Sequence, residues 1–424
     1  MKIHTQAVHA GDRKKAPPQI GVSTPVYTAA SYVTDGLEEQ DRIFGAQEQG
    51  YAYQRYMNPT NMALEEQITT FENGFGALAT ASGMSALQIA LTSVLLNRPK
   101  SVICARDIYG ATIKLLNDVM APFSLRVRYV DTNDLQALDK SIAEETPGAV
   151  LIESISNPVL RVADIDAIAA RCRRVNAALL VDNTFATPML IRPLEHGAHM
   201  SIHSLTKFLS GHGDVLGGLV VSDEEHHETV RRMSRIYGPV LGPFESYLAM
   251  RGAKTFPLRM ERHCANAQAF AAWLRGHPAV SKVYYCDDPA HPDAAIIRRL
   301  LPAGLYGAMV SFELAGAAAA EAGGQRVLPG RCPHDGALPL DRLASRGAAA
   351  DEVRDGRHGV VAARVGGDRG SRRHHRRLRA GAGVTAQPGA AGQSAESACL
   401  STVGISARNS IKRHEFCWKE RVED

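Results

Sequence analysis

Short hydrophobic runs alternate with segments of helical periodicity along most of this chain. The runs lie at residues 101–105, 125–131, 148–153, 178–183, 200–204 and 217–222. Runs that are apolar throughout predict strands buried on both faces, and the helical segments between them predict crossover connections. We therefore predict an α/β protein whose large domain holds a mostly parallel sheet. In such a sheet the ligand lies at the carboxyl ends of the strands.

The two flanks of this alternating region have a different pattern. Residues 1–60 are rich in Gly, Pro, Tyr and Gln with little periodicity, which predicts an extended arm that packs on another body, such as a second subunit. We expect a helix to start at Thr60, with that residue as its cap. The large domain would then span 61–255. Helical patterns over about 243–277 and strand-like runs at 280–285 and 307–314 predict a second, smaller α/β domain that begins over 256–316.

Composition agrees with a soluble globular protein. Of the 424 residues, 45% are hydrophobic and 22% are charged, and the formal net charge of +4 is too small to indicate a nucleic-acid or membrane partner. The N-terminus lacks an apolar signal region, so we expect a cytoplasmic protein. A reducing compartment also fits the odd and scattered set of seven cysteines, Cys104, Cys172, Cys264, Cys286, Cys332, Cys399 and Cys417.

Two strand ends carry the residues that indicate chemistry. Asp182 ends a fully apolar run, where a carboxylate is costly unless it meets a cation. The protonated pyridine nitrogen of pyridoxal phosphate (PLP) is such a cation, although an aspartate that caps a turn explains the position equally well. Lys207 follows the next run and can lie beside Asp182. Partial burial would lower the pKa of this lysine and favour imine formation, whereas the alternative is a solvated surface lysine.

Phosphate-binding groups are found in three further places. Ser204 and Thr206 supply hydroxyls next to Lys207. The segment Ser82, Gly83 and Met84 precedes a helix whose first amide groups would point at an anion. Tyr53 and Arg55 lie in the arm, where a guanidinium can bind phosphate with two hydrogen bonds. An arm residue would most easily reach the cofactor of a neighbouring subunit.

The order of these motifs resembles one family of enzymes. The segments YxRxxNPT, SGMSA, an IYG turn, ESxSNP, VDNTF, SxTKxxxGHxDVxGG and LRMERH together resemble the Cys/Met-metabolism family of PLP-dependent enzymes. This family includes cystathionine γ-synthase, cystathionine γ-lyase, methionine γ-lyase and the homoserine-ester sulfhydrylases. The resemblance covers about residues 3–316 and implies a fold-type-I PLP-dependent transferase.

The resemblance also implies a role for each matching residue. Lys207 would hold PLP as a Schiff base and move protons, Asp182 would pair with the ring nitrogen, and Tyr109 would stack on the ring and assist proton transfer. The other cofactor-binding residues would be Ser82, Gly83, Met84, Glu153, Asn157, Thr184, Ser204 and Thr206, with Tyr53 and Arg55 from a partner subunit in a dimer of dimers.

The implied reaction is γ-replacement or γ-elimination on a sulfur-containing or homoserine-derived amino acid. Methionine γ-lyases usually carry cysteine two residues after the stacking tyrosine, and Ala111 stands there in this chain, which disfavours that member. An aminotransferase shares the aspartate and lysine, but the YxRxxNPT arm argues against it. A pseudoenzyme that binds PLP without turnover is the non-enzyme alternative.

Other charged or metal-like groupings have simpler explanations. EEHH at 224–227 is expected to be a solvated helix face, and Cys332 with His334 lacks the second pair that a zinc site needs. The basic segment at 371–379 has no interleaved aromatic residues of a nucleic-acid site. We expect no metal.

The C-terminal region departs from the family. Family members carry a Ser-Leu-Gly segment and later an Arg-x-Ser-x-x-x-Glu segment whose arginine holds the substrate carboxylate, and neither is present after residue 316. Codons read from their second base allow residues 328–345 to become SLGDVHTMALYPWIASHR and residues 360–377 to become LLRRVSVEIEAADDIIAD. Two matches at one offset indicate a frameshift between about Gly316 and Leu328. We therefore expect 317–424 to be largely disordered, the second domain to be incomplete, and the written chain to be poorly folded or inactive.

Overall fold

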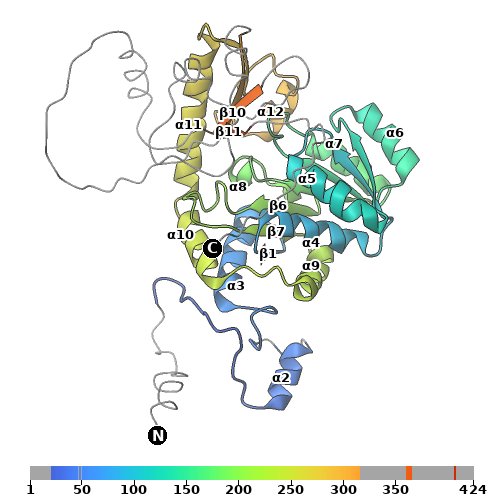
Figure 1. Cartoon of the computed structure of the whole chain (residues 1–424), viewed down its shortest axis with the longest axis vertical. Coiled ribbons are helices and arrows are strands. Elements are labelled where there is room, and N and C mark those ends of the chain that lie inside the picture. The colour runs from blue at the N-terminus through green and yellow to red at the C-terminus, as the bar shows by residue number, and fades with distance from the viewer. Residues whose placement is uncertain (1–20, 46, 49, 316–359, 365–404, 407–424) are drawn as a thin grey trace, which may run out of the picture.

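The structure of the chain is a computed structural model that describes residues 21–45, 47–48, 50–315, 360–364 and 405–406. A large sheet domain, a second smaller sheet beside the long helix α11, and a protruding arm with helix α2 make up these residues (Figure 1). The strands of the large sheet are β1 (Gly76–Thr80), β2 (Ser101–Ala105), β3 (Arg126–Val130), β4 (Ala149–Glu153), β5 (Ala178–Asp182), β6 (Met200–Ser204) and β7 (Gly218–Ser222).

The large sheet has seven strands in the order β1-β7-β6-β5-β4-β2-β3. The pairs from β6 through β5, β4 and β2 to β3 are parallel, whereas β7 is antiparallel to both of its neighbours. The prediction of a mostly parallel sheet is confirmed, and all six predicted runs are strands. The seventh strand, β1, was not predicted.

Helices cover both faces of this sheet, as its fully buried strands require. On one face lie α4 (Gly83–Leu95), which packs on β1 and on β4 to β7, and α9 (Glu224–Tyr237), which packs on α4, β1 and β7. The opposite face, formed by residues such as Leu179 and Val181, is covered by α3 (Pro59–Glu72), α6 (Leu135–Glu145) and α7 (Ile165–Arg174). Shorter helices are α2 (Leu37–Phe44), α5 (Gly110–Lys114) and α8 (Thr187–Leu190).

Helix α3 begins at Pro59, one residue before the predicted start. Asn58 caps it, because its Oδ1 accepts hydrogen bonds from the N–H groups of Thr60 and Asn61 at 2.9 and 3.3 Å. Pro59 takes the first helical position, where its missing N–H costs nothing. The prediction that Thr60 is the cap is wrong, since its hydroxyl instead donates to the carbonyl of Pro25 in the arm at 2.9 Å.

The second domain holds helices α11 (Phe256–Arg275) and α12 (Ala294–Leu300), whereas α10 (Pro243–Ala253) packs on α3 of the large domain. The sheet of the second domain has the order β11-β10-β9-β8, and β8 (Val280–Tyr284) and β9 (Met309–Leu314) lie where strands were predicted. Strands β10 (Val360–Arg364) and β11 (Ile405–Ser406) come from the region expected to be without regular structure. For these seven residues that prediction differs from the structure, and the rest of 317–424 lies outside the described residues. Within the described ranges, no helix combines the length and the apolar character needed to cross a bilayer.

Candidate functional site

Three of the predicted site residues lie side by side at the carboxyl edge of the large sheet. Glu153 ends β4 and Asp182 ends β5, and the two are paired in register, while Ser204 ends the next strand, β6. Because side chains alternate along a strand, all three share the face of Leu151, Leu180 and Ile202, which is the face covered by α4. The structure thus places these three residues at the strand ends, and their role in a site stays a prediction.

Asp182 is held by neutral hydrogen-bond donors. The N–H of Thr184 donates to its Oδ1 at 3.0 Å, and the Thr184 hydroxyl in turn accepts from the N–H of Ser204 at 2.9 Å. Burial raises the pKa of Asp182, although the hydrogen bonds from Thr184 and the charge of nearby His203 act in the opposite direction. A carboxyl group in this position favours an added cation, so the site fits a protonated pyridine nitrogen.

Lys207 lies on the turn that follows β6. The turn is closed by hydrogen bonds from the Lys207 N–H to the carbonyl of Ser204 at 3.3 Å and from the Gly211 N–H to the carbonyl of Lys207 at 3.0 Å. The prediction that this lysine is partly buried is wrong for the chain by itself, because Lys207 is exposed at the open edge of the sheet. The nearby Thr206 hydroxyl accepts from the N–H of Gly217 at 3.4 Å.

The start of helix α4 is close against the ends of β6 and β7. Ser82 caps the helix by accepting from the N–H of Ser85 at 3.1 Å, and Met84 follows in the first turn. A Cβ atom on Gly83 would lie 3.0 Å from that of Ser204, and one on Gly218 would lie 2.3 Å from the carbonyl oxygen of Ser82. Glycine is therefore needed for this approach. A helix N-terminus beside a serine hydroxyl fits a bound phosphate.

Glu153 connects two loops at the same edge. Its Oε1 accepts from the backbone N–H of Tyr109 at 2.7 Å, and its Oε2 accepts from the backbone N–H of Asn157 at 3.0 Å. Tyr109 is the N-terminal cap residue of α5 and is 49% exposed. The structure brings these three predicted residues together. It gives Glu153 the task of holding Tyr109 and Asn157 in place.

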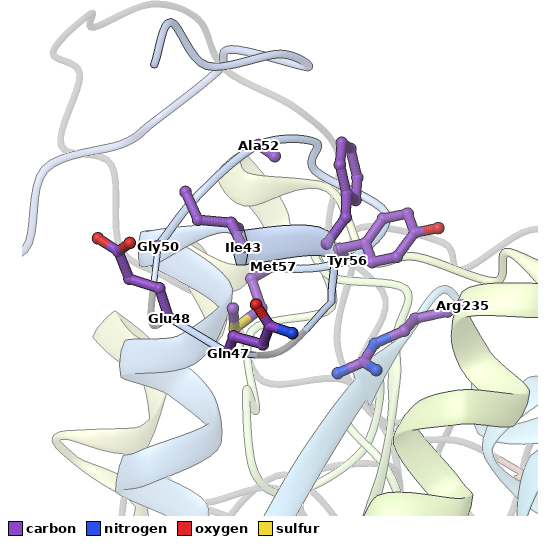
Figure 2. A pocket seen from close by; sticks show the side chains of 9 residues that line it. Ile43, Gln47, Glu48, Gly50, Ala52, Tyr56, Met57 and Arg235 are labelled. Atoms are coloured by element: carbon purple, nitrogen blue, oxygen red, sulfur yellow. The ribbon is translucent and has the colours of Figure 1, made fainter. Parts of the chain in front are cut away.

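Tyr53 and Arg55 lie on the arm, next to the C-terminal end of α9. The Arg55 guanidinium carbon is 5.6 Å from the ring centroid of Tyr53 and 5.2 Å from that of Tyr56, and its Nη1 donates to the carbonyl of Arg235 at the end of α9. Tyr56 and Arg235 also line a hollow of about 190 Å³ between the arm and α9 (Figure 2). These contacts are made within one chain, and a role of the arm in a neighbouring subunit's site stays a prediction.

The EEHH segment forms the first turn of α9. His226 is buried, its Nδ1 lies 2.7 Å from Oδ1 of Asp223, and its ring meets that of His199 edge-on at 5.3 Å. The expectation of a solvated face is therefore wrong for His226, because its ring turns inward. Among the residues with described positions, no group of three or more His, Cys, Asp or Glu side chains could hold a metal. Cys332, His334 and 371–379 lie outside those positions.

A buried cluster behind the strand ends was not predicted. Glu72, at the end of α3, contacts Asn183, Ser201 and His203. The sequence signal was a charged residue at the end of a helix together with a histidine inside an apolar strand. Only the tertiary structure shows that they meet.

Comparison with known proteins identifies the family of this chain. Residues 4–327 match the family model described as Cys/Met metabolism PLP-dependent enzyme. The chain belongs to this family. It is 38% identical over 317 residues to the L-methionine γ-lyase of Fusobacterium nucleatum subsp. nucleatum, a match that spans 74% of this chain and 79% of the relative. It is 40% identical over 312 residues to the cystathionine γ-synthase of Mycobacterium tuberculosis, spanning 73% and 77%.

Solved structures of this family share the fold. Cystathionine γ-lyase from Lactobacillus plantarum, complexed with L-serine, has a TM-score of 0.66 and 36% identity over 76% of this chain and 81% of its own. Cystathionine γ-synthase from Xanthomonas oryzae pv. oryzae, in complex with cystathionine, has a TM-score of 0.70 and 30% identity over 85% and 92%. The fold-type-I prediction and the PLP cofactor are thereby confirmed for this family member.

Proposed function

We propose that this chain uses PLP on Lys207 for γ-replacement or γ-elimination on a sulfur-containing or homoserine-derived amino acid, as trans-sulfuration requires. The observation that carries the proposal is the placement of Asp182 at the end of β5 and of Lys207 on the turn that follows the adjacent strand β6. The start of α4 and the Ser204 hydroxyl face the same edge. A family match over 4–327 supports this assignment.

Each residue has a distinct task in the proposed site. The amine of Lys207 holds the cofactor and then moves protons on the substrate, while Asp182 keeps the ring nitrogen protonated. The bound cofactor supplies an electron sink for the substrate carbon atoms. The Tyr109 ring stacks on it, and Glu153 fixes the backbone of that tyrosine. Phosphate would be bound by Ser82, Gly83, Met84, Ser204 and Thr206.

The arm supports a shared active site. It extends away from the sheet domain (Figure 1), and Tyr53 on it is 40% exposed. We propose that Tyr53 and Arg55 reach the phosphate of a second subunit. Mixing Arg55→Ala with Lys207→Ala subunits tests this in a chain recoded from residue 328, because the written chain is expected to be inactive and hybrid dimers of the recoded chain would contain one intact site. Recovery of turnover on mixing is expected, and a mixture as inactive as its two parents would contradict the proposal.

Turnover has a further requirement that concerns the C-terminus. The family match ends at residue 327, within the region where the frameshift was inferred. We infer that the written chain lacks the arginine that holds the substrate carboxylate, and that a chain recoded from residue 328 regains it. Both versions are expected to bind PLP, and only the recoded one is expected to turn over substrate. Normal turnover by the written chain would reject the frameshift, whereas no PLP binding by either version would reject the proposed function.

Products identify the reaction. The first substrate pair is cysteine or homocysteine with an acylated homoserine, which yields a thioether if the enzyme catalyses γ-replacement. Cystathionine is the second substrate, because γ-cleavage releases cysteine with 2-oxobutanoate and ammonia, whereas β-cleavage releases homocysteine with pyruvate and ammonia. Methionine is the third substrate to be tested. Formation of pyridoxamine phosphate with an amino acid would indicate an aminotransferase instead.

A further inference from the structure

A fully buried polar cluster lies on the face of the large sheet opposite the cofactor site. Oε1 of Glu72 accepts hydrogen bonds from Nδ2 of Asn183 at 3.0 Å and from the Ser201 hydroxyl at 3.0 Å, and it also contacts Nε2 of His203. All four side chains are 0% exposed. One carboxylate oxygen therefore joins groups from two strands.

The position of the cluster relates it to the residues of the site. Asn183 directly follows Asp182, and His203 directly precedes Ser204 on the strand that leads to Lys207. The backbone continues the link, because the N–H of Asn183 donates to the carbonyl of Ile202 at 2.8 Å. Glu72 thus holds the ends of β5 and β6 at one register.

The cluster is less favourable for stability than an apolar core would be. Oε2 of Glu72, Nδ1 of His203 and Oδ1 of Asn183 are buried without a hydrogen-bond partner among the described residues. Buried polar atoms in that state lower stability, and apolar residues of similar volume often serve packing as well or better. Stability alone therefore does not account for a carboxylate and an imidazole here.

We propose that Glu72 and His203 are positioning residues, which set Asp182 and Lys207 at the spacing that PLP needs. The inference rests on the proposed cofactor site. A slip between β5 and β6 would separate the aspartate from the lysine, and misplacement by about 1 Å is enough to impair a reacting group. The charge of His203 is also one of the influences that lower the pKa of Asp182.

The test compares two buried glutamates on the same helix in the full chain. Glu65 on α3 is also buried, but it accepts from the N–H of Ala79 at 2.9 Å and pairs with Arg231 at 2.9 Å, away from β5 and β6. Glu65→Gln is thus a matched control for Glu72→Gln. The readouts are the dissociation constant of PLP, the pH midpoint of the visible absorbance of the bound cofactor, and the melting temperature.

Glu72→Gln is expected to weaken PLP binding about tenfold and to move the absorbance midpoint. Glu65→Gln is expected to lower the melting temperature and leave both cofactor readouts unchanged. Equal cofactor readouts in the two variants would overturn the inference. If Glu72→Gln does not fold, His203→Gln must show the same shifts, and its failure to do so overturns the inference as well. A wild-type chain without PLP on Lys207 would overturn the proposed function instead.

Discussion

Two aspartates, one partly buried at the sheet edge and one buried at the junction of the domains, are held in opposite ways. Asp293, from the second domain, accepts from Nε and Nη2 of Arg161 at 2.7 and 2.9 Å and from the N–H of Val162 at 3.0 Å. Burial alone would raise its pKa, but the hydrogen bonds and charge of Arg161 bring that pKa below its usual value. Asp182 receives hydrogen bonds from Thr184, and burial leaves its pKa raised.

The difference separates a contact that is complete within the chain from the binding site that we propose. Asp293 has its cation within the chain, and it also accepts from Nδ2 of Asn133 at 3.0 Å, so it ties the second domain to the large domain. Asp182 gains a cation when a ligand supplies one. The contacts of Asp293 therefore attach the described part of the second domain to the large domain without the tail, and Asp182 is the aspartate that we propose to pair with the cofactor.

The largest effect is expected from Lys207→Ala. Removal of the amine removes covalent attachment of PLP, and turnover of the recoded chain should fall by about 10²–10⁴-fold. Visible absorbance of the purified protein and product formation are the measurements. Lys254→Ala, at an exposed lysine after α10, is the control and should leave both unchanged.

Asp293→Ala should destabilise the junction and spare the sheet edge. Arg161 would lose its buried partner, at a cost of about 2–3 kcal/mol in the free energy of unfolding, somewhat less than for a fully buried pair because Arg161 is partly exposed. Urea unfolding measures this cost. Glu48→Ala, the control, removes the partner of Arg42 in an exposed pair of the arm and should cost less than about 1 kcal/mol. A large loss of PLP affinity in Asp293→Ala would contradict the separation of the two regions.

Gly218→Ala tests the close approach of β7 to α4. The added Cβ would overlap the Ser82 carbonyl group, so we expect about 1–3 kcal/mol of destabilisation together with weaker PLP binding. Gly276→Ala is the control, since the nearest atom to its Cβ is 3.7 Å away. Unchanged PLP affinity in Gly218→Ala would show that the helix start does not bind the phosphate.

The smallest effects are opposite pH dependences of stability. The lowered pKa of Asp293 means that its contribution is present above the ordinary carboxyl pKa and is lost as pH falls through the folded-state value. For the cofactor-free chain, the raised pKa of Asp182 means the reverse, with stability lost as pH rises through the folded-state value. The free energy of unfolding, measured with urea at a series of pH values, gives both dependences. Asp293→Asn should remove the loss of stability at low pH, and Asp182→Asn should remove the loss of stability as pH rises. If both variants removed the same part of the pH dependence, the comparison of the two aspartates would be contradicted.

Local sequence patterns predicted the scaffold and its reactive edge. Apolar runs located the strands, and a carboxylate at the end of one run with a lysine after the next identified Asp182 and Lys207. The contacts of Glu72 and Asp293 could not be predicted in this way, because each joins residues more than a hundred positions apart. Thr184 and Glu153 were named through the family resemblance, and only the structure shows that they hold neighbouring backbone groups.

The most direct measurement of the central claim is where PLP attaches to the written chain. The purified protein would be incubated with PLP, reduced with borohydride and digested, and the modified peptide would be identified by mass spectrometry. We predict stoichiometric modification of Lys207, with the other lysines unmodified. Modification spread over many lysines, or absent from Lys207, would contradict the assignment of the cofactor site.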